Sequence, residues 1–121
     1  MGLTHRIDHD NREMFATADG PITFSDIRNH LLKERYEHGL TYAELIDART
    51  ASPAFLLEDI REIDSLLRVF AKEHALGPTA VVVRTDLDFD VIQVLEHLVE
   101  DVCAIRPFRD VDAALLWLRE I

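Results

Sequence analysis

Apolar and polar residues alternate at the start of the chain. The segment LTHRI, residues 3–7, has a two-residue period that is typical of a half-buried strand. Residues 9–11, His-Asp-Asn, are turn-forming, and the following REMFATA, residues 12–18, predicts a second strand that returns beside the first. We therefore expect an N-terminal hairpin that ends where Gly20-Pro21 interrupts the chain.

The rest of the chain switches between helical and strand-like patterns. Thr23 and Asp26 match a capping box, which predicts a helix that stops near Gly39. A later helix has the clearest amphipathic stripe in the chain, with 4-3-4-3 spacing at Leu56, Ile60, Ile63, Leu67 and Phe70. Two further helices follow residues 85 and 110, the second capped by Asp110.

Three more strands lie between these helices. AELIDA (43–48) and CAIRPF (103–108) flank AVVVRT (80–85), a β-branched run typical of a strand covered on both faces. The order β-β-α-β-α-β-α-β-α predicts one α/β domain over residues 1–121. Its mixed sheet of about five strands should be antiparallel at the hairpin and parallel elsewhere.

Composition and charge exclude several classes of function. The net charge is −10, from 23 acidic and 13 basic residues, so we expect no general binding to nucleic acid. The single cysteine, Cys103, fits a reducing compartment. No apolar run approaches the roughly 20 residues that span a bilayer. We expect a cytoplasmic protein without a transmembrane segment.

Three aspartates, Asp86, Asp88 and Asp90, resemble a metal-binding loop. A calcium loop starting at Asp86 would need glycine and glutamate at the positions that Val91 and His97 occupy. Acidic residues also gather at helix N-termini, where free N–H groups and the helix dipole attract them. We therefore predict helix capping and no metal at these positions.

Neither the cysteine nor the histidines form a recognisable catalytic motif. Cys103 and Arg109 have phosphatase-like spacing, but the intervening AIRPF has no glycine and reads as a strand, so we interpret Cys103 as a core residue. His30 and Glu34 lie one helical turn apart, and we interpret such pairs as parts of solvated helix faces. We expect no catalysis and no cofactor, although an enzyme site assembled across the fold would leave no local motif.

The segment from Arg49 to Ser52 is the strongest candidate for a functional site. Asp47 closes a strand, and we predict that Thr50 and Ser52 lie in the turn before the long helix. Loops at this edge of a parallel sheet commonly bind ligands and partners. Either hydroxyl can cap the helix, or it can accept a phosphate that the helix N-terminus stabilises.

The element order, AELIDA and the ending IRPFRDVDAALLWL together resemble the STAS (sulfate transporter and anti-sigma factor antagonist) family, as a small stand-alone bacterial member. The resemblance implies a SpoIIAA-like superhelix of strands and helices without catalytic activity. It also implies a protein partner, sometimes controlled by phosphorylation after the third strand. The paired serines and glycine of the family's antagonists are replaced here by DARTASP, residues 47–53.

Two functions follow, with an enzyme as a third. The first is a regulatory or protein-interaction module, and the second is a carrier of a small molecule or lipid. A deep apolar pocket between helices would favour the carrier, and a solid core with a flat exposed patch would favour the module. A homodimer is compatible with the apolar helix flanks at Leu66, Val69 and Val94.

Overall fold

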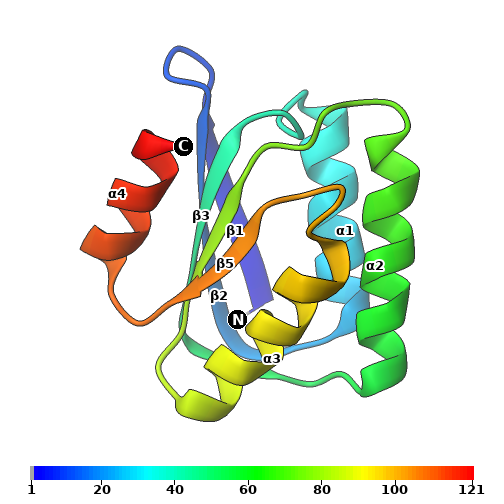
Figure 1. Cartoon of the computed structure of the whole chain (residues 1–121), viewed down its shortest axis with the longest axis vertical. Coiled ribbons are helices and arrows are strands. Elements are labelled where there is room, and N and C mark those ends of the chain that lie inside the picture. Colours follow the sequence, from blue (N-terminus) through cyan, green and yellow to red (C-terminus); the bar gives the residue numbers. More distant parts are fainter. Residues whose placement is uncertain (1) are drawn as a thin grey trace.

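A five-stranded sheet runs through the centre of the molecule, in the order β1-β2-β3-β4-β5 (Figure 1). The computed structural model describes residues 2–121, so the first residue of the predicted domain lies outside it. Its elements are β1 (Gly2–Asp8), β2 (Glu13–Ile22), α1 (Phe24–Tyr36), β3 (Ala43–Pro53), α2 (Leu57–Ala71), β4 (Thr79–Val82), α3 (Asp86–Val99), β5 (Ile105–Phe108) and α4 (Val111–Glu120). The predicted class and element order are confirmed.

The pairing of the strands is also as predicted. β1 and β2 form the antiparallel hairpin, and each later neighbouring pair is parallel. β4 lies inside the sheet, and three of its four residues are buried. β5 is an edge strand, which accommodates Pro107 because proline cannot donate a ladder hydrogen bond.

Helices cover both faces of the sheet unequally. α1, α2 and α3 lie on one face and α4 on the other (Figure 1). The larger core, between the sheet and the three helices, includes Ile63, Leu67, Val81 and Val99. The smaller core, beneath α4, includes Leu45, Val82 and Leu118.

No helix within residues 2–121 is long and apolar enough to cross a membrane.

Polar side chains define where several helices begin. Thr23 and Asp26 form the predicted capping box of α1, and Asp110 accepts hydrogen bonds from two backbone N–H groups at the start of α4. Thr85 caps α3, whose first turn carries Asp86 and Asp88. These acidic residues lie at a helix N-terminus, as expected from the helix dipole.

Two predicted chain breaks are wrong. β2 does not end at Gly20-Pro21 but continues to Ile22, and β3 continues to Pro53 beside it. Gly20 adopts a φ of +71°, a conformation that glycine tolerates. Pro21 lies beyond Asp19, where the described pairing with β1 stops, so its missing N–H is not needed for that pairing.

The extension of β3 changes the segment that precedes α2. Thr50 pairs with Asp19, and Ser52 pairs with Pro21, so both residues are strand residues. α2 begins only after Leu56, whose backbone N–H donates a hydrogen bond to Oδ2 of Asp59, with 2.8 Å between the nitrogen and the oxygen. The prediction that Thr50 and Ser52 lie in a turn and cap this helix is therefore wrong.

Candidate ligand pocket and buried histidine–glutamate cluster

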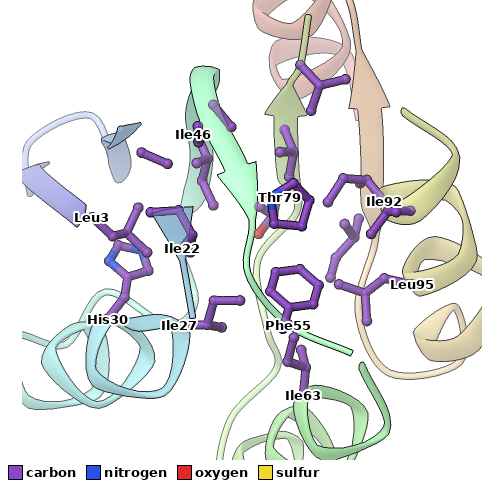
Figure 2. A pocket seen from close by; sticks show the side chains of 18 of the residues that line it. Leu3, Ile22, Ile27, His30, Ile46, Phe55, Ile63, Thr79, Ile92 and Leu95 are labelled. Carbon is purple, nitrogen blue, oxygen red and sulfur yellow. The ribbon is translucent and has the colours of Figure 1, made fainter. Parts of the chain in front are cut away.

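An apolar pocket lies between the sheet and the three helices α1, α2 and α3. Its cavity volume is about 170 Å³. Side chains that converge on it include Ile27 of α1, Ile63 of α2, and Ile92 and Leu95 of α3 (Figure 2). The floor is the face of the sheet opposite α4, with Ile22, Ile46 and Val81.

The period of β3 explains how the sheet contributes to this pocket. Glu44, Ile46 and Ala48 alternate along the strand and all line the pocket. Leu45, between them, belongs to the core beneath α4. Because both faces of β3 are covered, the side chain of Glu44 points into the interior of the protein.

The connection between β3 and α2 contributes an aromatic side chain. Phe55 follows the end of β3 and is half-buried. In Figure 2 its ring lies between Ile27 of α1 and Leu95 of α3. Leu56 and Leu57, the next two residues, are 70% and 62% exposed, so this connection also presents apolar side chains to solvent.

Three polar residues form a buried cluster beside the pocket, and two of them, His30 and Glu44, line it. His30, Glu34 and Glu44 are 4%, 3% and 3% exposed. The Nε2 atom of His30 is 2.7 Å from Oε2 of Glu44 and also contacts Oε1 of Glu34. His30 and Glu34 are one turn apart on α1, whereas Glu44 comes from β3. We name these residues the His30 cluster.

The predicted solvated position of His30 and Glu34 is therefore wrong. Ile27 and Leu31 lie on the inner face of α1, and residues 30 and 34 complete the same stripe at helical spacing. The signal was present in the sequence, but the polar chemistry of the two side chains concealed it. Glu44 was missed for the same reason: in AELIDA it alternates with the apolar Leu45, and a charged residue at such a position suggests a solvent-facing side chain.

Burial and mutual contact change the acid–base properties of the cluster. Burial lowers the pKa of His30, but the two glutamates outweigh this effect and raise it to about 10. Burial raises the pKa of Glu34, and the negative charge of Glu44 adds to the increase, giving about 8. Near neutral pH the cluster therefore holds an imidazolium and a protonated Glu34.

Hydrogen bonding within the cluster is incomplete. Among the described residues, His30 Nδ1 and Glu34 Oε1 are buried without a hydrogen-bond partner. The His5 ring lies edge-on to His30, with 5.0 Å between ring centroids, and its own Nε2 is 3.3 Å from Glu37 Oε2. An unpaired buried polar atom costs about 1–3 kcal/mol, so these two atoms lower the free energy of unfolding of the domain.

The residues predicted as a partner site lie elsewhere on β3. Arg49 and Asp47 form a two-pronged ion pair, with nitrogen–oxygen distances of 2.9 and 2.8 Å. The hydrogen bond from Arg49 lowers the pKa of Asp47. Thr50 is exposed and donates to the Ala18 carbonyl at 3.4 Å, while Ser52 is exposed and lines the pocket. The four residues remain neighbours in the structure, but on a strand.

The other sequence candidates are placed as follows. Cys103 is 7% exposed, and burial raises the pKa of its thiol to about 11, so it is a thiol inside the core as predicted. Arg109 forms an ion pair with Asp86 at 2.5 Å, and Cys103 Sγ lies 3.7 Å from the carbonyl oxygen of Gly77. The predicted capping by the aspartates is therefore wrong in its residue: Thr85 caps α3, while Asp86 and Asp88 lie in its first turn.

Comparison with known proteins gives a structural match only. Neither a protein-family model nor a curated protein matches this chain. Its structure is similar to that of an uncharacterized protein from the DUF3478 family, from Shewanella loihica PV-4, described as having a SpoIIAA-like fold. The TM-score is 0.66 at 20% sequence identity, and the match covers 97% of this chain and 94% of the other. The predicted resemblance is confirmed for the fold: this protein has a SpoIIAA-like fold.

Proposed function

We propose that this domain binds a small apolar or amphipathic molecule in the pocket between its sheet and α1, α2 and α3. The observation that supports the proposal is the cavity of about 170 Å³ in the larger core. Protein interiors are normally close-packed, with few voids larger than a water molecule. A domain whose only task was to present a flat surface would gain stability by filling this space.

The size of the cavity limits the ligand. An apolar cavity of about 150 Å³ stays dry and holds one benzene-sized molecule. The pocket is in the same range, so its ligand is a small ring, a short aliphatic chain, or the end of a longer chain that leaves through an opening. Burying apolar surface supplies the affinity, at about 25 cal/mol per Å² of apolar area.

The polar residues of the wall define the head of the ligand. His30 and Glu44 line the pocket together with Thr79 and Ser52, while nearly all other lining side chains are apolar. A few polar groups in an apolar cavity fix the orientation of a ligand. Glu44 pairs with Thr79 on the neighbouring strand, so an amphipathic ligand would place its polar group against His30, Glu44 and Thr79 and its apolar body against Ile27, Ile63 and Leu95.

A cavity-filling variant tests the proposal. Ala48 lines the pocket on β3, and Ala48→Phe should occupy much of the cavity. We expect alkylbenzenes of increasing chain length to bind the wild type and raise its melting temperature. The variant should bind them at least about tenfold more weakly, a difference of about 1.4 kcal/mol.

The matched control is Ala113→Phe, which adds the same side chain at an exposed position on α4, on the opposite face of the sheet. It should bind the probes like the wild type. Equal binding by wild type and Ala48→Phe, with both proteins folded, would rule out the pocket. Native mass spectrometry of the purified protein identifies any ligand that remains bound.

A protein-interaction module is the second candidate. It is supported by the SpoIIAA-like fold and by the exposure of Arg49, Thr50 and Ser52 at the pocket wall and beside it. Phosphorylation there would add about −1.5 to −2 charges to an already acidic protein. Thr50→Glu and Ser52→Glu should then change partner capture in a pull-down, with Thr4→Glu, also an exposed strand position, as control.

The lone buried cysteine supports a cytoplasmic location for either function.

A further inference from the structure

We propose that His30, Glu34 and Glu44 bind one divalent transition-metal ion of the zinc class at the wall of the pocket. The sequence alone predicts no metal site, because His30 and Glu34 read as part of a solvated helix face. The burial of all three side chains changes that expectation. This inference does not depend on the identity of an apolar ligand.

The donor atoms already converge. One ligand atom from each residue lies within 4.8 Å of the other two. Bound zinc holds nitrogen and carboxylate oxygen at about 2.0–2.2 Å, which places neighbouring donors somewhat over 3 Å apart. Both glutamates already contact the same His30 nitrogen, one of them at 2.7 Å. Small rotations of the side chains would open a space for the ion at their centre.

The single proton on His30 Nε2 does not account for the contacts of this nitrogen with both glutamates. The Nε2 atom of an imidazole carries at most one proton, so it can direct a strong hydrogen bond to only one carboxylate. The contact with Glu44 is a hydrogen bond, but Glu34 Oε1, which contacts the same nitrogen, has no hydrogen bond of its own among the described residues. A cation between the three side chains would supply the missing partner of that oxygen.

Charge and ligand chemistry are consistent with zinc. Once the ion displaces the protons held by His30 and Glu34, the two carboxylates, buried at 3% exposure, match its charge, which removes much of the cost of burying them. Imidazole and carboxylate ligands together suit zinc and neighbouring transition metals, whereas calcium requires six to eight oxygen ligands. Within this cluster, three protein ligands leave a fourth tetrahedral position for water or a ligand from the pocket.

The wall position provides a route for the ion. His30 and Glu44 line the pocket, so an ion can reach them from the cavity without opening the sheet. Two other groups lie nearby. His5 from β1 packs edge-on against the His30 ring, and Cys103 has a thiol pKa that is raised by burial and by the charges of both glutamates. Neither is needed as a ligand.

The test uses untagged, chelator-treated protein and zinc chloride as the probe. Calorimetric titration should show one zinc ion per chain, with weaker binding at lower pH because protons compete for the ligands. Glu34→Gln should reduce affinity by at least about tenfold, equivalent to about 1.4 kcal/mol. Cobalt substitution should give the strong visible absorption of a tetrahedral site.

Glu37→Gln is the matched control, because Glu37 is an exposed glutamate at the C-terminal end of the same helix and contacts His5 instead. It should bind zinc like the wild type. Glu44→Gln is a second ligand variant from a different element, and circular dichroism establishes that each variant is folded. Absence of stoichiometric zinc binding to the folded wild type would overturn the proposal. Binding that both ligand variants retain in full would overturn it equally, because zinc would then occupy exposed histidines.

Discussion

The imidazole of His30 and the carboxylate of Glu44 meet at 2.7 Å inside the protein, joining α1 to β3 across fourteen positions of sequence. The same nitrogen contacts Glu34, so one aromatic cation connects two acidic side chains that would otherwise repel each other. We therefore expect the stability of the domain to respond to substitution in this cluster and to pH.

Removing the cation of the His30 cluster should destabilise the fold. His30→Ala would leave two buried acidic groups without their partner, and breaking a buried ion pair in this way costs about 3–5 kcal/mol. The free energy of unfolding, measured by urea denaturation at pH 7, should fall by that amount. His97→Ala removes an exposed histidine from α3 and should change it by less than about 0.5 kcal/mol. A loss below about 1 kcal/mol for His30→Ala would contradict the stabilising role of the cluster.

The stability of the metal-free protein should decrease as pH rises from about 6 to 8.5. The pKa of Glu34 is raised from 4.5 to about 8, and that of His30 from 6.5 to about 10. The folded protein therefore binds both protons more tightly than the unfolded chain, so unfolding releases protons across this range. This stabilisation is complete below the unfolded-state pKa values and is lost as pH approaches the folded-state values.

Urea denaturation in the presence of a chelator, at several pH values, measures this dependence. Glu34→Gln cannot lose a proton, so its stability should fall less steeply between pH 6 and pH 8. The measurements stop at pH 8 because the thiol pKa of Cys103 is raised to about 11. At higher pH its titration would lower the free energy of unfolding as well. If wild type and Glu34→Gln show the same slope, the burial of Glu34 does not control its protonation.

Phe55 should set the size of the ligand that the pocket accepts. Its ring lies between Ile27 and Leu95, so Phe55→Ala should enlarge the cavity and admit bulkier apolar molecules. Thermal-shift measurements with an alkylbenzene series should show the optimum moving to larger members. Tyr36→Ala removes an aromatic ring that is 85% exposed and should leave the optimum unchanged. An unchanged optimum in Phe55→Ala would place the ring outside the binding space.

Thr50 should contribute little to stability, because it belongs to β3 and caps no helix. Thr50→Ala removes one weak hydrogen bond at 3.4 Å from an exposed side chain, so the loss should stay below about 0.5 kcal/mol. Asp110→Ala removes a true helix cap and should cost about 0.5–2 kcal/mol. Chemical denaturation of both variants makes the comparison, and a loss of 1 kcal/mol or more for Thr50→Ala would show that its strand position matters.

Much of the architecture could be predicted because it depends on local periods. Alternation in the first strands, the stripe of α2 and the caps at Thr23 and Asp110 each act within a few residues. The β-branched run of β4 likewise indicated a strand covered on both faces. These local preferences, together with the rule for parallel crossovers, were enough to determine the α/β class and the order of the elements.

The ends of β2 and β3 depended on pairing between distant segments. Gly20-Pro21 and the segment from Arg49 to Ser52 both have turn-forming character alone. In the structure they lie side by side, and each supplies the backbone partners that keep the other extended. Pairing energy of this kind cannot be read from either segment by itself, so the predicted turn became a strand.

The His30 cluster shows the same limit for a functional site. The sequence predicts a solvated helix face for His30 and Glu34 and does not single out Glu44, whereas all three side chains are buried in the structure. Only the tertiary structure decided that these residues meet, because α1 and β3 lie against the same pocket. Burial then removes water from the three side chains and raises the pKa of Glu34, while the two glutamates raise the pKa of His30 against the effect of burial. The same convergence makes all three residues candidate metal ligands.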